Sequence, residues 1–163
     1  MWVERIMGNI ADGLALTPGP ADFLDLPWDQ CGRMLRSRTR QGQPIRVLLP
    51  PGSQLRHGDV LVDDNDQRVI VNVLPCDLIV ARPATAGDMA MLCLELGNLH
   101  WPTQITEGEV LFIEDAPPME ILAQLQAPWS RESRRFEPTP IGPGPRRPGD
   151  SATDQTDSHG RDE

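Results

Sequence analysis

The first half of the chain carries short apolar runs that are separated by turn-forming residues. Three runs rich in β-branched residues are Ile45–Leu49, Val60–Val62 and Val69–Leu74. Gly, Pro, Asn and Asp fill the intervals between them, which is a pattern typical of hairpins. The alternation in Met34–Thr39 predicts an earlier strand, and Trp2–Met7 is a further candidate. The pattern therefore predicts a small β-sheet or barrel in this half.

After Pro75 the pattern changes to a mixture of strands and helices. It predicts a strand, a helix, two strands, a helix and a strand, at Asp77–Ala81, Ala86–Leu96, Gln104–Ile105, Val110–Ile113, Pro117–Gln126 and Arg134–Glu137. Thr85 is a suitable cap for the first of these helices, and Gly97 with Asn98 is a suitable stop. The order β-α-β-β-α-β is that of a ferredoxin-like motif. The fold class predicted for the whole chain is therefore α+β.

The helix predicted at Ala86–Leu96 is apolar on more than one side. One face at helical spacing consists of Met89, Leu92, Cys93 and Leu96. Met91 and Leu94 lie on other faces and are also apolar. A single sheet in a small domain cannot cover both sides of such a helix, so we expect a homodimer contact there.

The last residues of the chain differ from the rest in composition. Residues 139–163 are rich in Pro, Gly and acids and hold almost no apolar side chains. Such a segment cannot bury enough surface to offset its ordering entropy, so we expect a disordered tail. We accordingly divide the chain into an N-terminal β-domain (1–74), a ferredoxin-like domain (75–138) and this tail (139–163).

Composition and charge exclude several classes of function. All 15 basic residues are arginines, and 24 acids give a net charge of −9, which argues against nucleic-acid binding. The longest apolar run, Met89–Leu94, is far shorter than the roughly 18 residues of a membrane-spanning helix. No leader opens the chain, and three widely spaced cysteines indicate a reducing compartment, so we expect a cytoplasmic protein. No phosphate loop, nucleophile elbow or paired-cysteine motif is present, and we expect no enzyme.

The three histidines are the remaining candidates for chemistry. His57 lies in a polar turn, where a solvated side chain is the simplest expectation. His159 lies among acids in the predicted tail, and by itself it suggests a bystander. His100 follows the first helix of the second half, where position alone favours a loop or capping residue.

The surroundings of His100 change this interpretation. The segment LELGNLHWPTQI resembles the glycine-asparagine-x-histidine-x-proline signature of the urease accessory nickel chaperones, the UreE family. The stretches IRVLLPPGSQLRHGDVLV, VERIMGNIAD and Phe136-Glu137-Pro138 are also similar to segments of that family. The resemblance covers about residues 1–138.

Membership of this family would imply a non-enzymatic nickel metallochaperone. The β-domain would make protein or peptide contacts, and the ferredoxin-like domain would dimerise and bind Ni²⁺ near the two-fold axis. The matching ligand is His100, one from each subunit of a homodimer. The family also implies donation of Ni²⁺ to apo-urease together with the accessory GTPase UreG. Imidazole ligands suit nickel but do not select against Zn²⁺ or Cu²⁺, so those ions are expected to bind in vitro.

The sequence departs from the family beyond His100. Many members have a histidine-aspartate-histidine segment where this chain has Glu114-Asp115-Ala116, and many end in a histidine-rich tail where this chain has only His159. We therefore expect one ion per dimer, with His159 as an optional extra ligand and Glu114 as a weak one. A thiolate site is a weaker alternative, because Cys31, which we expect to be exposed, has no cysteine nearby in sequence.

The missing histidines leave a second function open. The chain could be a metal-free module that binds proteins through its β-domain and dimerises through its ferredoxin-like half. An RNA-binding ferredoxin-like domain is disfavoured, because the charge is wrong and no aromatic pair lies on a predicted strand of the second half.

Overall fold

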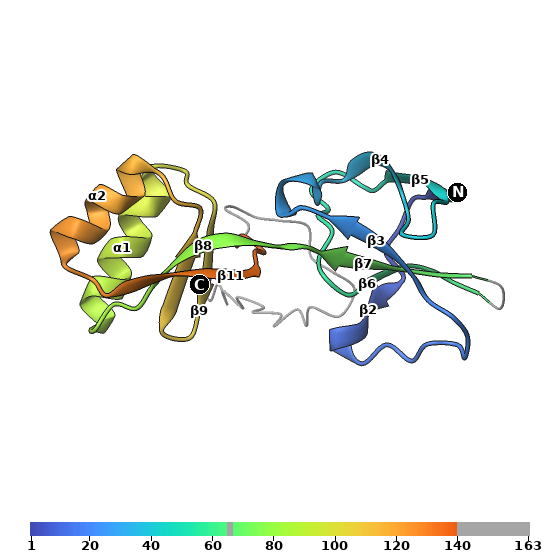
Figure 1. The fold of residues 1–163 in the computed structure, drawn as a ribbon, viewed down its shortest axis with the longest axis horizontal. Coiled ribbons are helices and arrows are strands. Elements are labelled where there is room, and N and C mark those ends of the chain that lie inside the picture. The colour runs from blue at the N-terminus through green and yellow to red at the C-terminus, as the bar shows by residue number, and fades with distance from the viewer. Residues whose placement is uncertain (65–66, 140–163) are drawn as a thin grey trace, which may run out of the picture.

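The computed structural model describes residues 1–64 and 67–139, and these residues form three sheets and two α-helices (Figure 1). The strands of the N-terminal half are β1 (Trp2–Val3), β2 (Gly8–Asn9), β3 (Asp22–Leu26), β4 (Met34–Arg38), β5 (Pro44–Leu48), β6 (Asp59–Asp63) and β7 (Arg68–Val73). They make one sheet of order β1-β5-β4 and a second of order β2-β6-β7-β3. The predicted all-β architecture of this half is confirmed.

Two strands differ from the sequence-based prediction. The predicted strand Trp2–Met7 is wrong in extent, because β1 ends at Val3 and the next strand, β2, begins at Gly8 and joins the other sheet. Strand β3 was not predicted, and it pairs in parallel with β7. Its alternation is masked because the acid Asp22 takes a buried position and the apolar Phe23 takes an outward one.

The N-terminal core lies between these two sheets. It is built from side chains of both sheets and of the connecting loops, including Leu24, Leu26, Ile45, Val47, Leu55, Val69 and Val71. The core also contains Cys31, which is only 4% exposed. The expectation that Cys31 is exposed is therefore wrong, because the short turn at Trp28–Gln30 brings it onto the sheets.

The C-terminal half has the predicted order of elements. They are β8 (Pro75–Ala81), α1 (Ala86–Asn98), β9 (Thr103–Thr106), β10 (Glu109–Phe112), α2 (Ala116–Leu125) and β11 (Trp129–Arg135). The sheet order β11-β8-β10-β9 is the split βαβ arrangement of a ferredoxin-like fold. The final strand lies earlier than predicted, at Trp129–Arg135 rather than 134–137.

The C-terminal sheet is covered on both faces. On one face α1 and α2 pack over a core that includes Ile79, Ala81, Val110 and Phe112 (Figure 1). On the other face Leu78, Val80 and Leu111 form a smaller cluster with Phe136 and Trp28. The rings of Trp28 and Phe136 meet edge to face with centroids 4.9 Å apart. This contact joins the C-terminal sheet to a loop of the N-terminal half.

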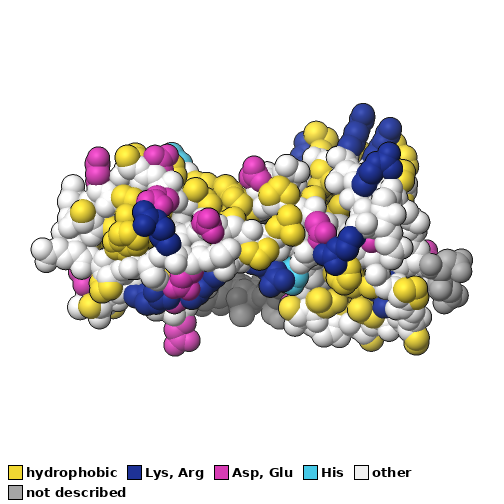
Figure 2. Space-filling model, viewed as in Figure 1, with side chains coloured by type: hydrophobic (Ala, Val, Ile, Leu, Met, Phe, Trp, Pro, Cys, Tyr) yellow, Lys and Arg dark blue, Asp and Glu magenta, His cyan; other side chains and the backbone are white. Residues whose placement is uncertain are grey.

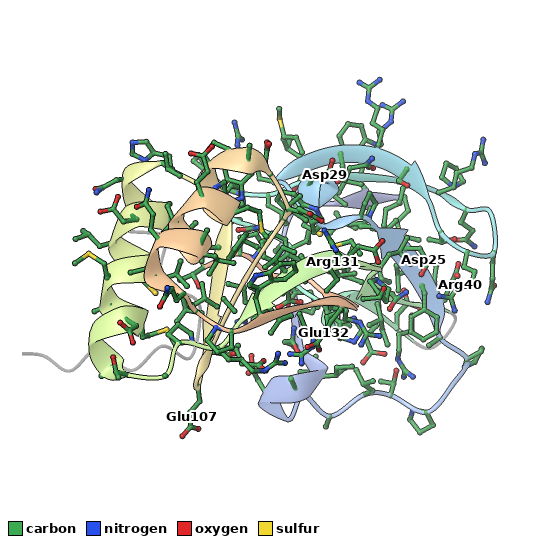
Figure 3. All side chains as sticks on the ribbon, turned by 60° about the vertical axis from the view of Figure 1, so that its left-hand side comes forward. Asp25, Asp29, Arg40, Glu107, Arg131 and Glu132 are labelled. Atoms are coloured by element: carbon green, nitrogen blue, oxygen red, sulfur yellow. The ribbon has the colours of Figure 1, made fainter. Side chains whose placement is uncertain are left out.

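An ion-pair network links β10 and β11 to the residue that follows β8. Arg82 donates to Glu109 and Glu132 with N···O distances of 2.9 and 2.6 Å. Arg134 also reaches Glu109 and Glu132, at 2.7 and 2.6 Å. Figure 3 labels Glu132 and its neighbour Arg131 on β11. Hydrogen bonds from Ser130 and Arg82, together with Arg134, lower the pKa of the Glu132 carboxyl to about 2.

Two further expectations concern the chain as a whole. Among the described residues, no helix is both long and apolar enough to span a membrane. The predicted tail, residues 139–163, lies outside the described residues except for Thr139, whose N–H donates to the carbonyl of Thr103 at 2.8 Å.

Candidate metal-binding site

Helix α1 positions the candidate ligand His100, and its start follows a standard cap. The Thr85 hydroxyl accepts a hydrogen bond from the Asp88 N–H at 3.1 Å and donates to the Asp88 carboxylate at 2.7 Å. This reciprocal arrangement satisfies a backbone donor that the first turn would otherwise leave unpaired. The predicted cap is confirmed. Leu92 and Leu96 are buried on the face that meets the sheet and fix the rotation of the helix.

The end of α1 is a Schellman turn centred on His100. The His100 N–H donates to the Gly97 carbonyl at 2.9 Å, and the Trp101 N–H donates to the Leu96 carbonyl at 3.0 Å. These two bonds satisfy the last carbonyls of the helix. Trp101 and Leu96 belong to the same core cluster, which supplies the apolar contact that accompanies this motif.

His100 occupies the left-handed position of this turn. Its φ is +52°, a conformation that favours glycine and costs other residues about 1–2 kcal/mol. Strain of this kind persists where the surroundings enforce it, and it is often found at functional sites. The His100 side chain is exposed to solvent. The turn therefore presents an imidazole outward on a fixed backbone.

The residues after His100 hold this turn against β10. The Trp101 indole N–H donates to the carbonyl of Ile113, which follows β10, at 3.2 Å. The Thr103 hydroxyl donates to the Trp101 carbonyl at 2.8 Å. The turn is thereby tied to the stretch that carries Glu114, the weaker candidate ligand.

Glu114 is already paired. Arg131 of β11 donates to both of its carboxylate oxygens, with N···O distances of 2.8 and 2.5 Å. The hydrogen bond from Arg131 lowers the pKa of the Glu114 carboxyl, so this side chain is an anion with its charge balanced. Residues 1–64 and 67–139 bring together no group of three or more His, Cys, Asp or Glu side chains that could hold a metal ion.

The other two histidines lie elsewhere. His57 is half-buried beside β6, and its backbone N–H donates to the Glu137 carboxylate at 2.7 Å. Its imidazole Nδ1 is buried without a partner among the described residues. Burial and the nearby Arg135 lower the pKa of His57, so it differs from the solvated turn residue that we expected. His159 lies outside the described residues.

Burial disfavours the thiolate form of the three cysteines. Burial, followed by the nearby Glu137, raises the pKa of the Cys31 thiol to about 12. Burial also raises the thiol pKa values of Cys76 and Cys93. Because thiolates are the form that binds metals, these shifts disfavour the sulfur alternative.

An apolar stripe runs along the outer side of α1 toward His100. Met91 and Leu94 are 48% and 57% exposed, and Leu99, next to His100, is 42% exposed. The first two are three residues apart on the helix and therefore lie side by side. Sequence reasoning identified Met91 and Leu94 as unpartnered, and the structure leaves them uncovered.

The all-β half followed by a ferredoxin-like half defines a two-domain α+β protein with an exposed histidine after the first helix of its second domain. The chain belongs to the UreE urease accessory protein family. The model of the family's N-terminal domain matches residues 3–74, and that of its C-terminal domain matches residues 76–163.

Individual relatives match over most of their length. The urease accessory protein UreE of Geobacillus kaustophilus is 35% identical over 137 residues, which cover 84% of this chain and 93% of the relative. The protein of that name from Staphylococcus carnosus is 35% identical over 83% of this chain and 91% of its own length. The one from Acetivibrio thermocellus is 31% identical over 87% of this chain and 92% of its own length.

Proposed function

We propose that this chain is a nickel carrier that donates Ni²⁺ during assembly of the urease metallocentre, with His100 of two subunits as the principal ligands. It acts on apo-urease together with the accessory GTPase UreG, in the cytoplasm, and as a carrier rather than as an enzyme. The ferredoxin-like domain holds the ion, and the β-domain contacts partner proteins.

The observation that carries the proposal is the presentation of His100. Its imidazole is exposed on a backbone turn that two hydrogen bonds and the Trp101 anchor hold in place. A histidine in a left-handed position of a helix end has no structural advantage over glycine or asparagine there. A ligand role accounts for this residue, whereas a capping role does not.

A second subunit would supply the further nitrogen that one chain lacks. Two-fold symmetry places equal patches of both subunits together, so one histidine near the axis becomes a pair. The apolar stripe of Met91, Leu94 and Leu99 ends beside His100 and offers a surface for such a contact. Two imidazoles suit a nickel ion and leave coordination positions open for transfer.

The other candidate ligands contribute less. Glu114 would have to give up two hydrogen bonds from Arg131 before it could bind an ion. His159 is an optional further ligand from the tail. We therefore propose one ion per dimer and no storage of several ions.

Calorimetric titration of the full chain with Ni²⁺ tests the proposal. We expect wild-type protein to bind one ion per two chains and His100→Ala to bind at least a hundredfold more weakly, because one substitution removes both imidazoles. His57→Ala is the matched control, since the hydrogen bond to Glu137 uses its backbone N–H and survives the change. Wild-type affinity in His100→Ala would show that the ion binds elsewhere.

The metal-free alternative makes the opposite prediction. Loss of the auxiliary histidines and the pairing of Glu114 with Arg131 favour a module that only binds proteins and dimerises. In that case the wild-type chain would bind urease assembly proteins, and its calorimetric titration with Ni²⁺ would show no heat of binding that depends on His100.

A further inference from the structure

The segment that contains strands β4 and β5 carries a concentration of positive charge that the acidic chain shows nowhere else in sequence. From Arg33 to Gly58 the chain has six arginines and no acid, although its net charge is −9. Figure 2 shows Lys and Arg side chains, in dark blue, gathered at the upper right, where Figure 1 places β4 and β5. Since the chain has no lysine, this group consists of arginines.

The strand register defines the face. Trp2 of β1 lies opposite Arg46 of β5, and Arg46 lies opposite Arg36 of β4. In the next row Met34 lies opposite Leu48. All five side chains are exposed, with Trp2 at 64% and Met34 at 61%. We call these five residues the arginine–tryptophan face.

The charges of this face are not balanced within the described chain. Neither Arg36 nor Arg46 forms an ion pair with residues 1–64 or 67–139. The guanidinium of Arg46 lies over the Trp2 ring, 5.2 Å from its centroid. Like charges directly opposite each other on neighbouring strands are destabilising, so the Arg36–Arg46 pair costs stability that a bound carboxylate would offset.

The apolar side chains of this face are also exposed to solvent. Trp2, Met34 and Leu48 are each at least 42% exposed. Tryptophan, methionine and arginine together are the composition enriched where proteins bind proteins. A duplex nucleic acid fits less well, because the remainder of this acidic chain would repel its phosphates.

From these observations we infer that the arginine–tryptophan face is a docking surface for a partner protein whose own surface presents carboxylates around an apolar side chain. The inference rests on the proposed function for the identity of the partner, which would be a component of the urease assembly machinery. In Figure 1 this face lies at the end of the molecule opposite α1 and α2, so docking leaves the His100 turn free.

Binding of the full chain to purified apo-urease and to the accessory GTPase of the same organism tests the inference. The variant Arg36→Gln/Arg46→Gln should bind its partner at least tenfold more weakly. The control Ala123→Glu/Gln124→Glu makes the same change in net charge at exposed positions of α2 and should bind like wild type. Added salt should weaken wild-type binding more than that of the arginine variant, because exposed charges are screened.

A second variant tests the apolar part of the face. Trp2→Ala/Met34→Ala removes exposed side chains, so the fold should be retained and binding should weaken. Equal binding by wild type and both face variants would overturn this inference alone and leave nickel binding by His100 standing. If the wild-type chain bound neither apo-urease nor the GTPase, both this inference and the partners in the proposed function would be wrong. Face-dependent binding only to duplex DNA, to phosphatidylserine vesicles or to a second copy of the chain would also overturn it.

Discussion

The apolar stripe on α1 gives a quantitative prediction for the dimer. Met91 and Leu94 are 48% and 57% exposed in one chain. Complete burial of a Met or Leu side chain contributes about 1.5–3 kcal/mol, so covering the exposed half of each contributes about 0.7–1.7 kcal/mol. Two residues on each of two subunits then give about 3–6 kcal/mol of dimer stability.

The variant Met91→Ala/Leu94→Ala should therefore dissociate far more readily. A loss of about 3–6 kcal/mol raises the dissociation constant of the dimer by about 10² to 10⁴. Sedimentation of the full chain over a range of concentrations measures this constant directly. The monomer fold should persist, because neither side chain belongs to the buried core.

Matched substitutions separate this effect from a general loss of hydrophobicity. Met7 and Leu74 are exposed to a similar degree, at 46% and 39%, but lie in the N-terminal half. Met7→Ala/Leu74→Ala should leave the dimer unchanged. The reasoning would be refuted by a wild-type chain that is monomeric at micromolar concentration, or by a stripe variant with the wild-type dissociation constant.

Three further predictions concern folding. In urea titrations the free energy of unfolding of His100→Gly should be about 1 kcal/mol higher than that of His100→Ala, because glycine adopts the left-handed φ without strain. Both variants should lose nickel binding. Equal stability of the two variants would contradict the strained backbone at this position. Because the pKa of Glu132 falls from 4.5 to about 2 in the fold, its stabilising effect is complete above pH 4.5 and is lost as the pH falls toward 2. Between neutral pH and pH 3, the free energy of unfolding of Glu132→Gln should therefore fall less than that of wild type. Equal decreases would count against a stabilising role of the Glu132 carboxylate. Removing Gly142–Glu163 should leave the thermal melt unchanged, whereas a drop of several degrees would show that the tail stabilises the fold.

The C-terminal fold was predictable because its signals are local. Helix α1 has a cap at Thr85 and a 3.6-residue apolar period, and each acts within a few residues. The predicted stop at Gly97 and Asn98 is wrong, because both residues lie inside the helix and the left-handed residue that ends it is His100. The short hairpin strands β9 and β10 follow from the Glu107-Gly108 turn between them. These local signals determine the element order, and the order implies the topology.

The N-terminal half was less predictable because its strands depend on distant partners. Strand β3 contains Asp25, whose carboxylate accepts hydrogen bonds from Arg40 and Asn72. Figure 3 labels Asp25 and Arg40, which lie close together. An acid in a strand is disfavoured until such partners balance it, and the sequence alone does not show which residues they are. The burial of Cys31 depends in the same way on long-range packing.

Of the candidate metal site, the sequence predicted the exposed histidine but not the surroundings of the second candidate, Glu114. The motif around His100 identified that residue, and the structure added the reason for its presentation, the left-handed turn tied by Trp101. The pairing of Glu114 with Arg131 was not evident, because the two residues are separated by the whole of α2.

The two proposed surfaces are compatible in one assembly because they lie at opposite ends of the molecule. Helices α1 and α2 form one end, and the sheet β1-β5-β4 forms the other (Figure 1). A two-fold dimer joined through the stripe on α1 would bury the nickel ligands near its axis and leave both arginine–tryptophan faces outward. A partner assembly with two acidic surfaces could then engage both faces at once, and the second contact would form at a high effective concentration. Substitutions that separate the subunits should therefore weaken both nickel binding and partner binding, whereas substitutions on the face should weaken partner binding alone.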